Sequence, residues 1–134
     1  MKEISGGVTA AKGFKAAGIH VGVKSKNVNK KDLALIVSDV ECTAAAVYTL
    51  NKVKAAPIYV TMDNIENGTA RAIICNSGNA NACAPNGHEN AVKMCSAAAK
   101  ELGIDASDVI VASTGVIGQE INVSVIEQGM HELA

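Results

Sequence analysis

The sequence has few aromatic residues and little arginine. It contains no tryptophan, and its only aromatic residues are Phe14, Tyr48 and Tyr59. Proteins that hold nucleic acids generally use stacked aromatic rings or clustered cations. Arg71 is the only arginine, the lysines are spread along the chain, and the formal net charge is -1. We therefore expect no nucleic-acid partner, and we expect a core built from small aliphatic side chains.

Long apolar runs are also missing, because the longest is far short of the ~20 residues that a membrane-spanning helix needs. Hydrophobic residues make up 49% of the chain and charged residues 19%, a composition that excludes a disordered chain. The segment Met1–Gly7 lacks the apolar core of a secretory signal. We expect no membrane contact, a cytoplasmic location, and a single α/β domain over residues 1–134.

Paired metal ligands are absent as well. No two cysteines form a C-x-x-C pair, and no second histidine or cysteine stands three or four residues from His88. This spacing favours reduced cysteines that pack as small residues over disulfides or a zinc site, and we expect no metal. The residues concerned are Cys42, Cys75, Cys83, Cys95, His20, His88 and His131.

The common phosphate-binding and hydrolase motifs are not present. The glycine pair of Gly115–Gly118 lacks the spacing and the lysine of a phosphate-binding P-loop. No G-x-G-x-x-G sequence follows a strand, and neither a G-x-S-x-G elbow nor an H-E-x-x-H helix occurs. The sequence thus offers no support for a dinucleotide fold or for any of these hydrolase classes.

Short β-branched and apolar runs predict several strands. Alternation places Ile19, Val21 and Val23 on one face of a first strand, and polar Lys24–Lys31 follows as a solvated hairpin loop. A nearly continuous apolar run predicts that the second strand is buried on both faces. The run Ala44–Asn51 could by propensity be a helix or a strand, and its β-forming residues favour a strand that pairs with Leu33–Val37. The runs after the first are Asp32–Asp39, Ala44–Asn51, Arg71–Cys75 and Val109–Ala112.

Three segments carry helix signals. Pro57 suits the first turn of a helix over Ala56–Glu66, which Gly68 would terminate. The clearest helix is Glu89–Leu102, with Gly103 as its stop. Its expected inward stripe is Val92, Cys95, Ala99 and Leu102. A third helix begins at Ser124, where Glu127 completes a capping box.

Two predicted turns are rich in polar side chains or in glycine. Residues Asn76–Asn81 follow a strand with three amides, a serine and a glycine, which favours a hydrogen-bonded structural loop over a ligand site. The run Val109–Gly118 ends abruptly at Ser113, Thr114 and Gly115. A glycine lets a backbone N–H approach a ligand closely, and the neighbouring threonine hydroxyl is a second donor. Two such donors are what a developing oxyanion requires, although Thr-Gly pairs are common in ordinary turns.

Several stretches, in this order, resemble the bifunctional ornithine acetyltransferase and N-acetylglutamate synthase family of arginine biosynthesis. The resemblance covers almost the whole chain and is most specific where amides or glycines cluster. The stretches are Gly6-Gly-Val-Thr-Ala10 with Lys12-Gly-Phe14, Asp32-Leu-Ala-Leu-Ile36, Asn51-x-Val-x-Ala-Ala-Pro57, Asn76-Ser-Gly-Asn-Ala-Asn-Ala82 and Ser113-Thr-Gly-Val-Ile-Gly118.

The resemblance implies an N-terminal part of an α-chain. Family members are made as a precursor that cleaves itself before a threonine, and this threonine becomes the N-terminal nucleophile of a β-chain. The acetyl group passes from N-acetylornithine to that threonine and then to glutamate, without a cofactor. Some members also use acetyl-CoA as a substrate. The implied assembly is a heterotetramer of two α- and two β-chains.

The same resemblance assigns the oxyanion hole to Thr114 and Gly115, with Asn79 and Asn81 as neighbours of the site. It implies a layered α/β sandwich with sheets between helices, similar to self-processing enzymes of the D-aminopeptidase type. The substrate-binding residues remain unassigned. The first helical turns after Ser124 bring the sequence to Ala134 without a residue that matches the nucleophile, so we expect this chain alone to be inactive.

Two further functions remain open at this stage. The first is a non-catalytic binding or assembly module that keeps the fold without the chemistry. The second is a standalone hydrolase that uses Ser77 or Ser113, for which the sequence provides no placed histidine base.

Overall fold

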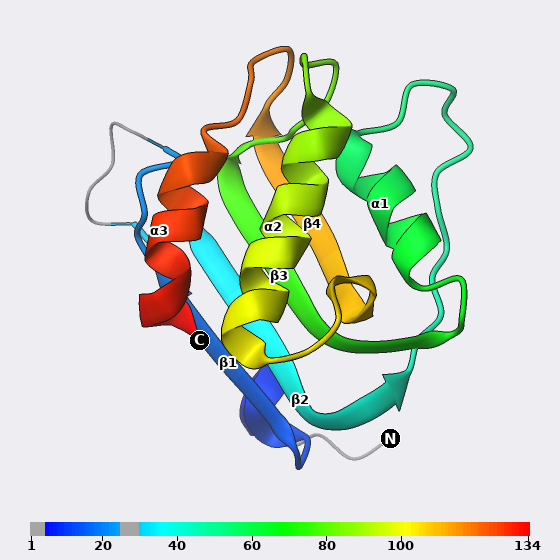
Figure 1. Cartoon of the computed structure of the whole chain (residues 1–134), viewed down its shortest axis with the longest axis vertical. Coiled ribbons are helices and arrows are strands. Elements are labelled where there is room, and N and C mark those ends of the chain that lie inside the picture. Colours follow the sequence, from blue (N-terminus) through cyan, green and yellow to red (C-terminus); the bar gives the residue numbers. More distant parts are fainter. Residues whose placement is uncertain (1–4, 25–29) are drawn as a thin grey trace.

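The computed structural model describes residues 5–24 and 30–134. Most of these residues belong to one four-stranded sheet and three α-helices (Figure 1). The strands are β1 (Phe14–Ile19), β2 (Leu33–Thr43), β3 (Thr69–Asn79) and β4 (Val109–Val116). The helices are α1 (Ala56–Asn64), α2 (Gly87–Leu102) and α3 (Val123–Leu133), with short 3-10 turns η1 (Val8–Ala10) and η2 (Ala106–Asp108).

The strands lie in the order β1-β2-β3-β4. Both β1 with β2 and β2 with β3 pair antiparallel, whereas β3 and β4 are parallel. Parallel neighbours require a crossover, and α2 provides it. The carboxyl ends of β3 and β4 therefore meet at the same edge of the sheet.

All three helices cover one face of the sheet (Figure 1). The core lies between these two layers and is aliphatic, as the shortage of aromatics predicts. Alanines on α2 allow that helix to lie close to the strands. The core side chains include Leu33, Leu35, Ala72, Ile74, Ala91, Met94, Ala98, Val109, Val111, Ile126, Met130 and Leu133.

The outer edge of β4 is covered by polar side chains of α1. The Thr61 hydroxyl donates to the Val111 carbonyl at 2.9 Å and accepts the Val111 N–H at 3.2 Å. The Asn64 amide donates to the Val109 carbonyl at 2.8 Å. These bonds satisfy backbone groups that a fifth strand would otherwise pair with.

The helix predictions are mostly confirmed. Pro57 lies in the first turn of α1, and Gly103 ends α2 with a φ of 65°. The predicted stripe of α2 is wrong at Val92, which is exposed, because the helix turns Ala91 and Met94 inward instead. The core includes Cys95 and Ala99, and Leu102 is partly buried against it.

The predicted capping box at the start of α3 is wrong. The helix begins at Val123, with Asn122 in the N-cap position and no side-chain cap hydrogen bond. The Ser124 hydroxyl instead donates to the Asn122 side-chain oxygen at 2.6 Å. This local bond removes the serine from the capping role.

The strand predictions needed three corrections. The first strand is Phe14–Ile19, so Val21 and Val23 follow it rather than belong to it. The segment Ala44–Asn51 is not a strand, because the neighbours of β2 are β1 and β3. Residues 25–29 of the predicted hairpin loop lie outside the described residues.

The prediction that the second strand is buried on both faces is also wrong. Leu33 and Leu35 are buried, whereas Ala34 is exposed and Ile36 is only half-buried. The apolar side chains of the strand are thus fully buried on its helix face alone, although Ser38 is buried on the other face. The continuous apolar run reflects a second apolar face, the open face of the sheet, and not two covered faces.

The open face of the sheet carries Phe14, Ile36, Ile73 and Ile110. Residues 44–55, hereafter the exposed segment, connect β2 to α1 and carry three large exposed apolar side chains. Val47 is 99% exposed and Leu50 97% exposed, and Val53 is exposed as well. Among the described residues, no helix has the length and apolar content that a membrane crossing requires.

Candidate functional site

The carboxyl ends of β3 and β4 meet at a contact between two glycines. Register places Ser77 beside Thr114 and Gly78 beside Gly115. Gly115 has a φ of 136°, and a Cβ there would collide with the Gly78 carbonyl carbon and lie 2.6 Å from its oxygen. Only glycine allows both this backbone conformation and this close approach of the β3 and β4 backbones.

Thr114 is exposed at the end of β4, directly before that contact. Alternation along β4 turns Val109, Val111 and Ser113 toward the helices, and it turns Thr114 toward the open face of the sheet. Asn79 of β3 pairs with both Thr114 and Val116. The predicted site residues Thr114, Gly115 and Asn79 are therefore neighbours in space, and the threonine is accessible.

The amides of the Asn76–Asn81 stretch are used within the chain. The Asn76 amide donates to the Asn79 carbonyl at 2.9 Å, and the Asn79 side-chain oxygen accepts the Asn81 N–H at 2.8 Å. The Asn81 amide donates to the Gly87 carbonyl at 2.7 Å. These bonds fix the polypeptide between β3 and α2, as the structural-loop prediction requires, although β3 itself extends to Asn79.

Further bonds join this stretch to the turn that follows β4. The Asn79 amide donates to the Gln119 carbonyl at 3.1 Å. The N–H of Ala80 donates to the Val116 carbonyl, and that of Gly118 to the Ala82 carbonyl, each at 2.9 Å. The two strand ends are thus bound to each other on both sides of the glycine contact.

The buried carboxylate of Asp32 binds the N–H of Lys24, the residue that lies against Gly78. Asp32 is only 3% exposed and accepts the backbone N–H groups of Val21 at 2.7 Å and of Gly22 and Lys24 at 3.1 Å. Burial raises the pKa of this carboxyl, but the backbone hydrogen bonds and the adjacent His20 outweigh burial and hold its pKa below the usual range. Sequence reasoning missed this group; its signal is an aspartate directly before an apolar strand.

The ArgJ family model matches residues 15–134. The chain belongs to the ArgJ family. The bifunctional arginine biosynthesis protein ArgJ of Symbiobacterium thermophilum is 45% identical over 135 residues, which cover 100% of this chain and 34% of that protein. The chloroplastic ArgJ of Oryza sativa subsp. indica is 43% identical and is covered to 29% of its length, against 98% of this chain. The chain thus spans about a third of the length of these curated relatives.

Two solved ArgJ-family structures share the fold. The Bacillus halodurans ArgJ crystal structure superposes with a TM-score of 0.89 at 48% identity, over 96% of this chain and 67% of that chain. Ornithine acetyltransferase from Mycobacterium tuberculosis, complexed with ornithine, superposes with a TM-score of 0.87 at 38% identity, over 95% of this chain and 68% of that chain. The sheet and helices described above are therefore the ArgJ fold over this region.

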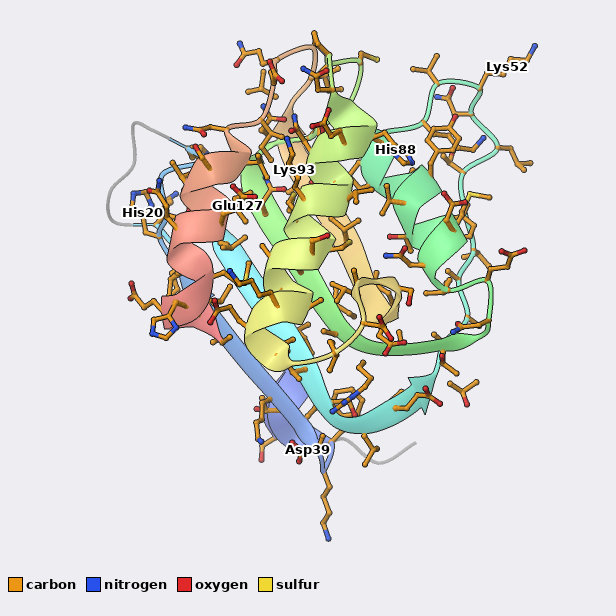
Figure 2. The ribbon with its side chains drawn as sticks, viewed as in Figure 1. His20, Asp39, Lys52, His88, Lys93 and Glu127 are labelled. Atoms are coloured by element: carbon orange, nitrogen blue, oxygen red, sulfur yellow. The ribbon has the colours of Figure 1, made fainter. Side chains whose placement is uncertain are left out.

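The titratable side chains of this ArgJ-family chain are dispersed. His20 and His88 lie far apart on the molecule (Figure 2), and His131 contacts Glu101 at 3.1 Å. Within residues 5–24 and 30–134, no three histidine, cysteine or acidic side chains gather as metal ligands would. His88 is exposed at the start of α2, consistent with the expected surface position.

The cysteines differ in burial. The prediction of buried packing is confirmed for Cys95, where burial raises the pKa of the thiol to about 11 despite the hydrogen bond from Asn64. Burial also raises the pKa of Cys75. The prediction is wrong for Cys83, which is exposed in the loop before α2. All four are free thiols in this structure.

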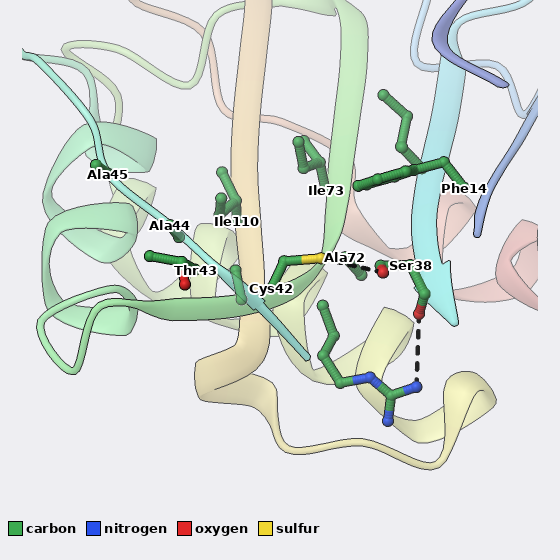
Figure 3. A pocket seen from close by; sticks show the side chains of 12 residues that line it. Phe14, Ser38, Cys42, Thr43, Ala44, Ala45, Ala72, Ile73 and Ile110 are labelled. Atoms are coloured by element: carbon green, nitrogen blue, oxygen red, sulfur yellow. Dashed lines mark hydrogen bonds between the residues drawn. The ribbon is translucent and has the colours of Figure 1, made fainter. Parts of the chain in front are cut away.

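A separate cavity of about 250 Å³ lies on the open face near the start of β4. Figure 3 shows Phe14, Ile73 and Ile110 around it, and the Cys42 thiol donates to the Ser38 hydroxyl at 3.1 Å beside it. Ile110 is at the opposite end of β4 from Thr114. This cavity is therefore distinct from the glycine contact at the carboxyl ends.

Proposed function

We propose that this chain is the N-terminal part of the α-chain of an ornithine acetyltransferase, and that Thr114 and Gly115 form its oxyanion hole. The observation that carries the proposal is the close contact between the backbones of Gly115 and Gly78, together with the exposure of the neighbouring Thr114. Membership of the ArgJ family supports it, as does the relative that was solved with ornithine. Residues 1–134 form one α/β domain in this proposal.

The proposed chemistry begins with a threonine at the N-terminus of a β-chain. Its hydroxyl oxygen attacks the acetyl carbonyl of N-acetylornithine, and its own α-amino group takes the hydroxyl proton. The Thr114 hydroxyl and the Gly115 N–H donate to the oxygen that becomes negative. The C–N bond then breaks, protonated ornithine leaves, and an acetyl-threonine ester remains.

The second half of the cycle reverses these steps with another amine. The amino group of glutamate attacks the ester carbonyl, and the same two donors stabilise the second tetrahedral intermediate. Breaking the C–O bond returns the threonine and releases N-acetylglutamate. Acetyl-CoA can replace N-acetylornithine as the acetyl donor in this scheme, because only the leaving group differs.

A layered arrangement follows from the apolar open face. Phe14, Ile36, Ile73 and Ile110 form an apolar surface that the helices do not cover. A second sheet from the remainder of an ArgJ-type protein would cover this surface and complete a sandwich with sheets between helices. Thr114 is on the same face by strand alternation, so the packed partner would bring the nucleophile to the oxyanion hole.

We further propose an α/β heterodimer that associates into a heterotetramer in the cytoplasm. The exposed segment supports an interface, because Val47 and Leu50 are almost fully exposed apolar side chains. The pairing of α- and β-chains would bury them. Size-exclusion chromatography with light scattering of the assembled chains measures this stoichiometry.

A chimera tests the activity. This chain replaces the matching N-terminal region of Bacillus halodurans ArgJ, to which it is 48% identical. We expect the chimera to transfer acetyl from N-acetylornithine to glutamate, and a parallel reaction with acetyl-CoA reports the second donor. We expect Thr114→Ala to lower kcat about a hundredfold, the typical effect of removing one oxyanion donor.

Thr43→Ala is the matched control, since Thr43 is an exposed threonine at the end of β2. It should retain the activity of the unmodified chimera. A folded chimera that transfers no acetyl group would overturn the proposed enzyme and favour the non-catalytic module. Transfer that is undiminished in Thr114→Ala would leave the enzyme intact but overturn the assigned oxyanion hole.

A further inference from the structure

Asp32 joins three parts of the chain behind the glycine contact. Its backbone N–H donates to the Ile19 carbonyl at the end of β1, and its carbonyl accepts the Ser77 N–H of β3, each at 2.9 Å. Its carboxylate accepts three N–H groups from residues 21–24. The residue therefore positions the 21–24 turn relative to β3 through both its backbone and its side chain.

The 21–24 turn ends against Gly78. Lys24 comes so close that a Cβ on Gly78 would lie 2.9 Å from the Lys24 Cβ and 3.3 Å from its Cα. Gly78 has a φ of 110°, so both its conformation and its space demand glycine. The peptide between Gly78 and Asn79 in turn leaves no room for a Cβ on Gly115.

Lys24, Gly78 and Gly115 thus form three consecutive backbone layers. A shift of the first layer is transmitted to the second, since no space separates them. Asp32 is the group that fixes the first layer, because its Oδ2 holds the Lys24 N–H. His20 adds a contact to the same oxygen at 3.4 Å, and its Nδ1 lies 2.9 Å from the Lys30 carbonyl.

We propose that Asp32 is a positioning residue for the oxyanion hole, acting through Lys24 and Gly78 on the Gly115 N–H. The proposal rests on the function proposed above for Thr114 and Gly115. Asp32 itself does not contact the substrate in this scheme. Its effect is on the direction of a hydrogen bond that is needed in the transition state.

The kinetic test uses the same chimera. We expect Asp32→Asn to lower kcat for acetyl transfer about tenfold, with KM for N-acetylornithine within about twofold, because a misplaced donor weakens transition-state binding. The matched control is Asp39→Asn, since Asp39 lies near the other end of the same strand and pairs with Lys15 on the surface. It should leave both parameters unchanged.

A double variant separates positioning from general destabilisation. If Asp32 acts on the Gly115 N–H through Lys24, Asp32→Asn should cost little further activity once Lys24→Gly has removed the Lys24 Cβ that contacts Gly78. A purely structural role predicts that the two losses multiply. Multiplied losses, or an Asp32→Asn variant as active as the unmodified chimera, would overturn the positioning role while the proposed function stands.

Amide hydrogen exchange provides a readout that needs no activity. We expect Asp32→Asn to speed exchange at Ser77–Asn79 and Thr114–Gly115 about tenfold or more, whereas Asp39→Asn should not. If Asp32→Asn does not fold, Lys24→Gly gives the second variant, because it keeps the N–H bond to Asp32 and removes the Cβ that contacts Gly78. Unchanged exchange at these amides in the folded variant overturns the proposal, even if the chimera lacks acetyltransferase activity.

Discussion

The joined ends of β3 and β4 contrast with the exposed segment, residues 44–55. At the strand ends, Asn76, Asn79 and Asn81 are buried polar residues whose amides bond to backbone groups of the same chain. In the exposed segment, Val47 and Leu50 are apolar residues almost wholly in solvent. Polarity and burial are thus reversed between the two regions.

This reversal distinguishes a region whose structure is stabilised by contacts within the chain from a region whose apolar side chains lack such contacts. A buried amide donor without an acceptor would be costly, so the bonds that the Asn76, Asn79 and Asn81 side-chain N–H groups make help to specify the strand ends. Exposed aliphatic side chains gain nothing from solvent and become stabilising only when covered. The geometry of the glycine contact is therefore set within this chain, whereas Val47 and Leu50 of the exposed segment have no cover from the described part of the chain.

The largest expected effect is at the glycine contact. Gly115→Ala should destabilise the fold by about 3 kcal/mol or more and lower acetyl transfer in the chimera over a hundredfold, because the new Cβ meets the Gly78 backbone. Gly118→Ala is the control: its φ is 79°, but nothing lies within 4 Å of the added Cβ. It should cost about 1 kcal/mol. Equal losses of thermal stability in the two variants would contradict the close-approach argument.

The next largest effect is expected when a substitution in the core is compared with one in the exposed segment. Ile126→Ala should lower the free energy of unfolding by about 2–5 kcal/mol, since Ile126 is the completely buried residue on the inner face of α3. Leu50→Ser should change it by no more than about 0.5 kcal/mol, because the leucine is exposed. Urea titration of the chain measures both. A large loss in Leu50→Ser would show that the exposed segment packs on its own chain.

The amide network should give an intermediate loss. Asn81→Ala removes the side-chain hydrogen bond to the Gly87 carbonyl at a residue that is only 1% exposed. We expect a cost of about 1–3 kcal/mol in chemical denaturation. Asn67→Ala, in the exposed turn before β3, loses only an exposed bond to Thr69 and serves as control. If both variants unfold at the same urea concentration, the network does not specify the strand ends.

The smallest expected effect is in thiol reactivity. Iodoacetamide should modify exposed Cys83 before buried Cys95, whose pKa of about 11 keeps it protonated. Since this pKa is above the ordinary 9.0, the Cys95 contribution to stability is complete below pH 9 and falls as the pH rises toward 11. Mass spectrometry of peptides after timed labelling gives the order. Early labelling of Cys95 at pH 8 would contradict the packed core.

The sequence pointed to the residues of the glycine contact and of the amide network, because glycine and asparagine are favoured where the backbone adopts unusual conformations. Gly115 was singled out as a turn glycine after a strand that ends at Ala112, whereas the structure places it inside β4, which continues to Val116. The loop predicted for Asn76–Asn81 is wrong over Asn76–Asn79, which belong to β3, although the predicted amide hydrogen bonds are present. Helix α2 followed from its periodicity and from Gly103.

Other features depend on contacts between distant residues. Asp32 was read as the start of a strand, although its carboxylate binds N–H groups eight to eleven residues earlier in the chain. The β-forming residues of Ala44–Asn51 predicted a strand, but both edges of β2 are already occupied by β1 and β3. Local propensity does not report which neighbours a strand will have.

The polar cover that α1 places over β4 limits how this sheet can associate. Thr61 and Asn64 occupy the carbonyls of Val109 and Val111, so an incoming strand finds these groups already bonded. Edge-to-edge pairing, the usual route to sheet extension and aggregation, is therefore blocked along this part of β4. An additional sheet can join here only by stacking on the apolar face, the approach that leads directly to the Thr114 side of the strand.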